Sequence, residues 1–285
     1  DTVVDDLPRT LCCQHPRALD DNFAAGLPAP VRHGVVTAAL DLLAHTISKP
    51  LAQLLGATTR RSVPIAAVVS TPEAAASAVA RGIGCLKVKA GVDSPTHDLE
   101  RIAAIRQAAP HARLRVDANG AWTRELARDI GQALAPMSLE WIEQPLAASD
   151  ITGLCRLRSQ ISTPIAVDET LADPGFRAAA LAKRAGDVLV LKPSAIGGVF
   201  ACLDLHAEAQ RCGLASCISF AWTSAVGQHA ALHLAAALPG PLQVCGLANP
   251  WARDVAQGAC ATPDGGGLCV PQTPGLGLRW TQEAA

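Results

Sequence analysis

The chain has 285 residues, of which 49% are hydrophobic and 17% charged, so it can bury one large barrel-type core or two smaller ones. Twenty-four basic and 25 acidic residues leave a formal charge of −1, and no segment concentrates Lys and Arg, which argues against nucleic acid as a partner. No apolar run reaches the roughly 18 residues of a membrane span, and no signal-peptide pattern opens the chain, so we expect a soluble cytoplasmic protein.

Cysteine and histidine are numerous, but they are not grouped as disulfides or metal sites require. The ten cysteines are scattered, apart from the adjacent Cys12 and Cys13, and the eight histidines form no His-x-x-x-His or His/Cys cluster. This spacing fits neither a secreted disulfide framework nor a zinc site. We therefore expect most cysteines to be small buried hydrophobic residues and zinc to be absent.

The first 60 residues are expected to be helical. Between residues 30 and 56 the apolar side chains recur at three- and four-residue spacing, and Pro50 and Gly56 punctuate the far end. At the other end of the chain, residues 248–285 are rich in Gly and Pro and predict an irregular tail that packs back on the rest. These boundaries divide the chain into segments 1–60, 61–247 and 248–285.

Residues 61–247 alternate short β-rich runs with alanine-rich helical stretches. Eight parallel strands joined by helices predict an α/β fold, a (β/α)8 TIM-type barrel. A doubly wound open sheet is the alternative, but no Gly-x-Gly-x-x-Gly turn follows the first strand. The expected strands are 62–69, 85–90, 113–119, 139–145, 165–170, 188–194, 215–220 and 243–247.

Charged residues stand within or at the ends of five consecutive expected strands. From the second lysine onward they follow at steps of 24 to 28 residues, which is one βα unit. The carboxyl ends of barrel strands meet at one mouth, so we expect these side chains to share a pocket. They are Lys87 and Lys89, Asp117, Glu143, Asp168 and Lys192.

Each of these residues also has an ordinary structural interpretation. The two lysines could lie on a solvated strand face. Asp117 could be no more than the start of a turn, and Asp168 no more than the cap of a helix. Glu143 could be a surface carboxylate, and Lys192 could extend to the rim. Their repetition at the same end of strand after strand favours a functional site.

Three carboxylates in one pocket repel each other unless a cation lies among them. Hard oxygen ligands with room for water and substrate favour Mg²⁺, with Mn²⁺ as a possible substitute. A divalent metal could hold a small carboxylate substrate and stabilise the charge formed when a proton leaves the adjacent carbon. We expect Lys89 to take that proton, Lys87 to favour its neutral form by charge repulsion, and Lys192 to act from the opposite side.

The motifs around these residues are "LKVKAG", "VDANGAW", "IEQPL", "VDET" and "LKPSAIGG", in this order. As a set they resemble the enolase superfamily, and within it the muconate lactonizing enzyme subgroup. The resemblance implies that Asp117, Glu143 and Asp168 bind Mg²⁺. It makes Lys89 the acid/base on one face of the substrate and Lys192 its counterpart on the other. Asn119 and Glu169 occupy positions where the family has polar residues beside the metal.

Two C-terminal stretches are "VLKPSAIGGV" and "CISFAWTSAVGQHAALHLAAALPGPLQVCGLA". They are most similar to the o-succinylbenzoate synthases of menaquinone biosynthesis. The resemblance implies a syn dehydration of 2-succinyl-6-hydroxy-2,4-cyclohexadiene-1-carboxylate. It also implies an N-terminal capping domain, of which residues 1–60 would hold a mainly helical part. Those synthases have a serine-rich turn with an acidic residue where this chain has Ser219, Phe220, Ala221, Trp222 and Thr223. We expect Ser219 to contact substrate and Phe220 and Trp222 to reshape the pocket.

Other functions use the same residues. A dipeptide epimerase or an N-succinylamino acid racemase would exchange a proton between Lys89 and Lys192, and a muconate-type cycloisomerase is a further alternative. A barrel that has lost turnover and acts as a binding or scaffold protein is the alternative from another class. The sequence leaves the oligomeric state open.

Overall fold

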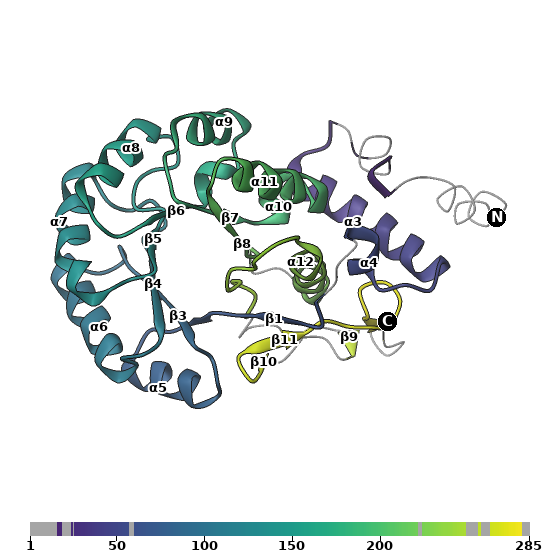
Figure 1. The fold of residues 1–285 in the computed structure, drawn as a ribbon, viewed down its shortest axis with the longest axis horizontal. Helices are drawn as coiled ribbons and strands as arrows, with labels where there is room; N and C mark the ends of the chain where they lie inside the picture. Colours follow the sequence, from purple (N-terminus) through teal and green to yellow (C-terminus); the bar gives the residue numbers. More distant parts are fainter. Residues whose placement is uncertain are drawn as a thin grey trace.

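The computed structural model of the protein describes residues 16–18, 24, 26–56, 60–221, 224–248, 256–257 and 263–280. Its largest sheet has seven parallel strands in chain order, and this sheet is strongly curved (Figure 1). The strands are β2 (Ala67–Val68), β3 (Cys85–Lys89), β4 (Arg113–Asp117), β5 (Trp141–Glu143), β6 (Ile165–Val167), β7 (Val188–Leu191) and β8 (Ala215–Ile218).

The segment at Cys245 and Gly246 closes the curved sheet into a ring. Cys245 forms a parallel bridge with Ile65 beside β2, and Gly246 forms one with Ser219 beside β8. The Cys245 N–H donates to Pro64 O at 2.8 Å, and the Gly246 N–H donates to Ile218 O at 2.9 Å. The expected TIM-type α/β fold is thus confirmed, with isolated bridges where the eighth strand was expected.

Helices alternate with the strands, and Figure 1 shows α5 to α9 along the outer side of the curved sheet. Each of these five begins at a side chain, Ser, Thr or Asp, that accepts a hydrogen bond from the first turn. The helical elements between and after the barrel strands are α5 (Pro72–Ala80), α6 (Pro95–Ala108), α7 (Arg124–Leu134), η1 (Ala135–Met137), α8 (Ile151–Gln160), η2 (Glu169–Leu171), α9 (Pro174–Lys183), α10 (Pro193–Ile196), α11 (Val199–Arg211) and α12 (Ala225–Ala237).

Helix α7 shows how such a helix docks on its neighbours. Its buried residues are Ala127, Ile130, Gly131 and Leu134, a spacing that places them on one face. A Cβ atom at Gly131 would lie 2.8 Å from the Ile161 side chain, so glycine permits the close approach to the end of α8. The polar remainder of the helix faces away from this contact.

Strand alternation explains how charged side chains enter the barrel. Successive side chains point to opposite faces of a sheet. Leu86, Val88 and Ile142 belong to the large core formed with the helices. Trp141, together with Ala166, Val190 and Cys217, belongs to a separate small cluster. Residues of the same parity as this inner cluster, which include both lysines of β3, therefore point into the barrel.

The expected strand 62–69 is wrong as one strand, because its two halves join different sheets. β1 (Ser62–Pro64) pairs antiparallel with β11 (Gly267–Cys269), which in turn pairs with β10 (Pro263–Asp264). Only β2 belongs to the barrel. The turn between β10 and β11 has two residues, Gly265 and Gly266, both at positive φ, as a tight hairpin requires. Part of the expected irregular tail is therefore a regular hairpin.

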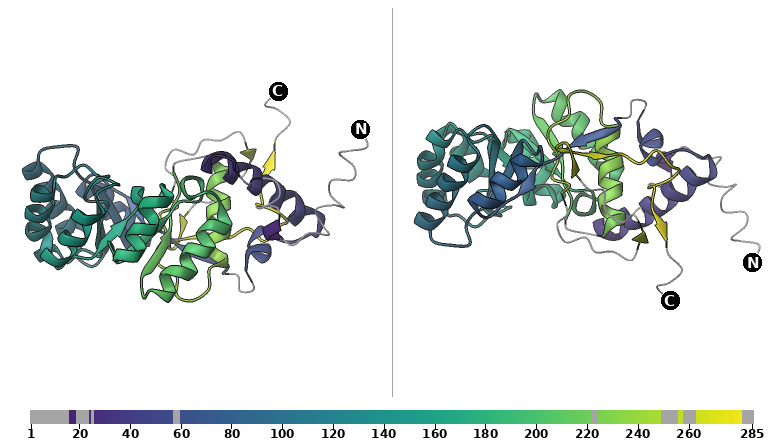
Figure 2. Two further views of the ribbon diagram at one scale, coloured as in Figure 1. Left: turned by 90° about the horizontal axis from the view of Figure 1, so that it is seen from above. Right: turned by 90° about the horizontal axis from the view of Figure 1, so that it is seen from below.

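The N-terminal helices lie beside the C-terminal segment. The expected helix over 30–56 is interrupted near Pro50, giving α3 (Ala29–Thr46) and α4 (Leu51–Leu55). The Leu51 N–H donates to Gly275 O at 2.8 Å, and the Leu276 N–H donates to Asp41 Oδ1 at 2.6 Å. Figure 2 shows these helices and the C-terminal strand β12 (Arg279–Trp280) toward one end of the molecule, with the barrel helices α5 to α8 at the other.

The remaining strand of the described chain is β9 (Ala256–Gln257), which pairs antiparallel with β12. Within the described residues, no helix has both the length and the apolar character needed to span a membrane.

Candidate active site

The site residues lie where the barrel strands end. Lys89, Asp117 and Glu143 are the last residues of β3, β4 and β5, and they are paired in register across these strands. Asp168, Lys192 and Ser219 directly follow β6, β7 and β8. The structure therefore brings the residues singled out in the sequence to one mouth, as their spacing predicts.

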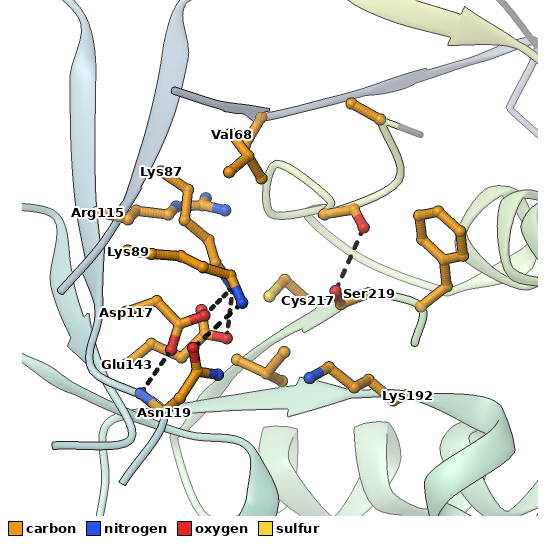
Figure 3. A pocket seen from close by; sticks show the side chains of 15 residues that line it. Val68, Lys87, Lys89, Arg115, Asp117, Asn119, Glu143, Lys192, Cys217 and Ser219 are labelled. Carbon is orange, nitrogen blue, oxygen red and sulfur yellow. Dashed lines mark hydrogen bonds and ion pairs between the residues drawn. The ribbon is translucent and has the colours of Figure 1, made fainter. Parts of the chain in front are cut away.

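A cavity occupies this mouth (Figure 3). Lys89 enters it from the β3 side and Lys192 from the β7 side, with their amino groups directed toward its centre. The carboxylates of Asp117 and Glu143 lie on the Lys89 side of the cavity. The lining residues are Ala66, Val68, Lys87, Lys89, Arg115, Asp117, Asn119, Glu143, Val190, Lys192, Cys217, Ser219, Phe220, Gly246 and Ala248.

Lys87 lies between two carboxylates of neighbouring strands. Its Nζ is 2.7 Å from Asp117 Oδ2 and 2.7 Å from Glu143 Oε1. Burial works to lower the pKa of Lys87, but the charges of Glu143 and Asp117 outweigh it and raise that pKa above its ordinary value. Lys87 is therefore a charged group that neutralises these carboxylates. Its influence on Lys89, expected from the sequence, stays a prediction.

Lys192 pairs with the third carboxylate, Asp168. Burial and then the nearby charge of Glu143 raise the pKa of Asp168 well above its ordinary value, even with Lys192 beside it. Burial also acts to raise the pKa of Glu143, but the charge and hydrogen bond of Lys87 outweigh burial and lower it. The cluster thus holds more negative charge than its two partner ammonium groups neutralise.

Lys89 takes part in a second, more exposed chain of contacts. Its Nζ donates to Asn119 Oδ1 at 3.2 Å, and Asn119 Nδ2 donates to Glu169 Oε1 at 3.1 Å. The Asn119 backbone N–H donates to Asp117 Oδ1 at 3.0 Å, and its φ of 45° is a conformation that asparagine tolerates. Asn119 therefore links the expected base to the carboxylates.

Gln144 is a structural residue of the site that our sequence reasoning missed. Its fully buried side-chain amide makes four hydrogen bonds: Oε1 accepts from the backbone N–H groups of Asp168 and Thr170, and Nε2 donates to Leu146 O and Thr170 Oγ1. It thereby fixes the turn that carries Asp168 and Glu169. The available signal was a polar residue between Glu143 and a proline in an otherwise buried strand.

Arg115 was missed as well. Its side chain is 3% exposed, donates to Glu140 Oε2 at 2.6 Å and to Val244 O at 2.9 Å, and lies 3.7 Å from the Trp141 ring. Its Nη2 is buried without a hydrogen-bond partner among the described groups. The inward parity of the second Arg in "RLRVDAN" was the signal that could have placed it in the barrel.

The side of the cavity next to β8 contains Ser219 and Phe220. Ser219 Oγ donates to Gly246 O at 3.3 Å, and Phe220 is buried against the cavity. Trp222 and Thr223 lie outside the described residues, as do Cys12 and Cys13. Phe220 and Trp222 were expected to reshape the pocket, and of these two the structure describes Phe220, which lies in the cavity wall.

The donor set fits a hard divalent cation in its chemistry. Asp117, Glu143 and Asp168 are buried carboxylates from three adjacent strand ends, with exposed fractions of 2 to 4%. In the present arrangement lysine ammonium groups contact these carboxylates, and no group of three His, Cys, Asp or Glu side chains in the described chain is spaced to ligate a metal ion. Binding a metal therefore requires the lysine contacts to loosen.

The fold and the site define an enzyme-like barrel of the enolase type. A family model described as enolase C-terminal domain-like matches residues 70–284, and the chain belongs to this family. An o-succinylbenzoate synthase from Thermobifida fusca is 39% identical over 197 residues, which cover 67% of this chain and 60% of that protein. This chain thus spans less than two thirds of that synthase.

Two further relatives widen the range of reactions found in the family. An N-succinylamino acid racemase from Thermus thermophilus is 31% identical over 284 residues, covering 96% of this chain and 76% of the racemase. The crystal structure of muconate cycloisomerase from Pseudomonas fluorescens matches with a TM-score of 0.83 at 25% identity, covering 88% of this chain and 72% of that one. The expected superfamily and subgroup are confirmed.

Proposed function

We propose that the protein abstracts a proton next to a substrate carboxylate in an Mg²⁺-dependent reaction, and that this reaction is the dehydration carried out by o-succinylbenzoate synthases. The observation that carries the proposal is the pair of lysines, Lys89 and Lys192, that enters one cavity from opposite sides. The buried carboxylates of Asp117 and Glu143 line this cavity, and that of Asp168 pairs with Lys192. The 39% identity to the Thermobifida synthase supports the choice of reaction.

Asp117, Glu143 and Asp168 would hold the Mg²⁺ ion, and Mn²⁺ could replace it. When bound, the metal supplies positive charge that stabilises the negative charge developing on the substrate carboxylate after deprotonation. Gln144 would keep Asp168 in place through its hydrogen bonds to the backbone of the η2 turn.

Lys89 would act as the base. It takes the proton from the carbon next to the ring carboxylate of 2-succinyl-6-hydroxy-2,4-cyclohexadiene-1-carboxylate. The same amino group, now protonated, donates a proton to the departing hydroxyl group on the same side of the ring. One water leaves, the ring becomes aromatic and Lys89 returns to its starting state. Lys192 would face the ring from the other side as a cation.

We also propose that residues 1–60 are a partial capping segment, that 61–247 form the barrel, and that 248–285 pack back on both. The contacts of Leu51 with Gly275 and of Asp41 with Leu276 support this division. A cap over the mouth excludes water and strengthens electrostatic interactions inside the site. In this proposal the protein acts in the cytoplasm, in menaquinone biosynthesis.

A racemase acting on N-succinylamino acids is the second candidate. The Thermus racemase aligns with 96% of this chain, and one lysine on each side of the cavity is what proton exchange between two faces of a carbon requires. Both candidates begin with the same step, loss of the proton next to a carboxylate. They differ in whether a hydroxyl leaves or a proton returns.

The test is the loss of ultraviolet absorbance of the cyclohexadiene substrate with Mg²⁺ or with a chelator. We expect rapid loss with wild-type protein and Mg²⁺, and a rate reduced at least about 1,000-fold in Lys89→Ala. Lys183→Ala removes a lysine from the exposed end of α9 and is the matched control. Absence of turnover together with racemisation of N-succinylamino acids would favour the second candidate, and absence of both would contradict the proposal.

A further inference from the structure

The end of strand β3 is where the expected base is attached to the fold. The Ala90 N–H donates to Asp117 O at 2.8 Å and continues the ladder with β4. On the opposite side of β3, the Lys87 carbonyl accepts from the Val69 N–H, and β2 ends at Val68. The Lys89 carbonyl faces the same side as that of Lys87 but lies beyond the end of β2, so it needs another partner.

Helix α6 supplies these partners through Asp98 and Arg101. Arg101 Nη2 donates to Lys89 O at 2.8 Å and also to Asp98 Oδ1. Asp98 Oδ2 accepts from the Gly91 N–H at 2.7 Å. The backbone from Lys89 to Gly91 is thus held at both ends by one ion pair. We call this arrangement, Lys89 O, Arg101, Asp98 and Gly91 N, the α6 bracket.

The ion pair of the α6 bracket is largely buried, and the turn that it holds packs closely against the loop after β4. Asp98 is 2% exposed and the Arg101 side chain 18%, so the ion pair is protected from screening. Gly91 has a φ of +86°, and a Cβ atom there would lie 2.7 Å from Ala121 Cβ. The turn after Lys89 is therefore wedged between α6 and the loop that follows β4.

We propose that Asp98 and Arg101 are positioning residues for Lys89: they set the backbone from which the base reaches the substrate. The inference deepens the proposed function and rests on it. Lys192, on the other side, is held differently, because its carbonyl accepts from Ala195 and Ile196 in the first turn of α10. Loss of the α6 bracket should therefore impair proton transfer on the Lys89 face and leave the Lys192 face nearly unchanged.

The experiment uses Arg101→Met, which removes the donors and keeps the apolar stem, with Arg101→Lys as the conservative variant. Arg128→Met removes an exposed arginine that also pairs with a neighbouring aspartate and is the matched control. Thermal unfolding verifies that each variant is folded. The first measurement is amide hydrogen exchange of Gly91 by NMR, which requires no substrate.

The second measurement is exchange of the α-proton of each enantiomer of an N-succinylamino acid in D₂O with Mg²⁺. Lys89→Ala and Lys192→Ala assign each enantiomer to a lysine. We expect Arg101→Met to speed Gly91 amide exchange at least about tenfold and to slow α-proton exchange on the Lys89 face about 10- to 100-fold, as a displacement of about 1 Å does. Exchange on the Lys192 face should change less than about twofold, and Arg101→Lys should recover part of the loss.

Three results would speak against the inference, in distinguishable ways. Unchanged Gly91 protection would show that the α6 bracket does not hold the turn. If α-proton exchange slowed equally on both faces, or slowed on neither face, Asp98 and Arg101 would have only a general structural role. Absence of exchange on both faces in the wild-type protein, with Gly91 protection still lost in the variant, would overturn the proposed function and with it the catalytic role of the α6 bracket.

Discussion

Acid should destabilise the protein through two histidines that hold the C-terminal segment. His233 is fully buried on α12, where its Nε2 lies 3.3 Å from Leu276 O and its Nδ1 accepts from the Ala52 N–H at 3.2 Å. His229 Nδ1 lies 2.8 Å from the same carbonyl. Because Nδ1 of His233 accepts a hydrogen bond, the neutral imidazole is the form that fits this site.

Burial lowers the pKa of His233 from 6.5 to about 4, and burial also lowers the pKa of His229. In the unfolded chain these residues take up protons near pH 6.5. Their contribution to stability is therefore complete above that pH and is lost as the pH falls from 6.5 toward 4. For His233 alone, the linkage relation gives a loss of about 2 to 3 kcal/mol between pH 7.5 and pH 4.5, and His229 adds to it.

The perturbation is His233→Gln, since an amide keeps a donor and an acceptor but does not titrate. We expect the variant to lose about 1 to 2 kcal/mol at pH 7.5. Between pH 7.5 and 4.5 its free energy of unfolding should fall by about 2 to 3 kcal/mol less than that of the wild type. Urea unfolding followed by tryptophan fluorescence at several pH values measures this difference. The exposed His111→Gln is the control and should run parallel to the wild type. Parallel curves for His233→Gln and wild type would refute the reasoning.

Two predictions concern the carboxylate cluster. Lys87→Met leaves Asp117 and Glu143 buried without their shared cation and should lower the free energy of unfolding of the metal-free protein by about 3 to 5 kcal/mol, measured by urea unfolding. Mg²⁺ should restore part of this stability. A variant whose stability does not change with Mg²⁺ would contradict the proposed ligands. Gln144→Leu removes the acceptor for the Asp168 N–H and should weaken Mg²⁺ binding about 10- to 100-fold by calorimetric titration, and an unchanged Kd would count against its positioning role.

The barrel and the position of its site follow from local sequence patterns. Near-continuous apolar strands at intervals of one βα unit predict helix-covered parallel strands, and their carboxyl ends are then fixed at one mouth. Side-chain alternation within "CLKVK" places Lys87 and Lys89 on the same side, and the structure places both in the cavity. What the pattern cannot specify is which carboxylate each ammonium group meets, because that depends on the register of neighbouring strands.

Long-range pairings were beyond the reach of the sequence pattern. The segment 62–69 has the composition of one strand, but β1 pairs with β11, roughly 200 residues away in the chain. No local periodicity encodes such a partner, and short strands with glycine and proline have weak propensity. Gln144 was missed for a related reason. Its φ of 38° and its bonds to the η2 turn depend on a loop that follows the next strand.

The charge of the cluster connects the metal to the substrate class. Two ammonium groups, Lys87 and Lys192, contact three buried carboxylates, Asp117, Glu143 and Asp168, which leaves this group with one negative charge. Lys89 also enters the cavity, so three lysines and three carboxylates balance at this mouth before a metal binds. In the proposed function a divalent cation held by the carboxylates would make the site positive. We therefore expect metal binding to strengthen the binding of an anionic substrate.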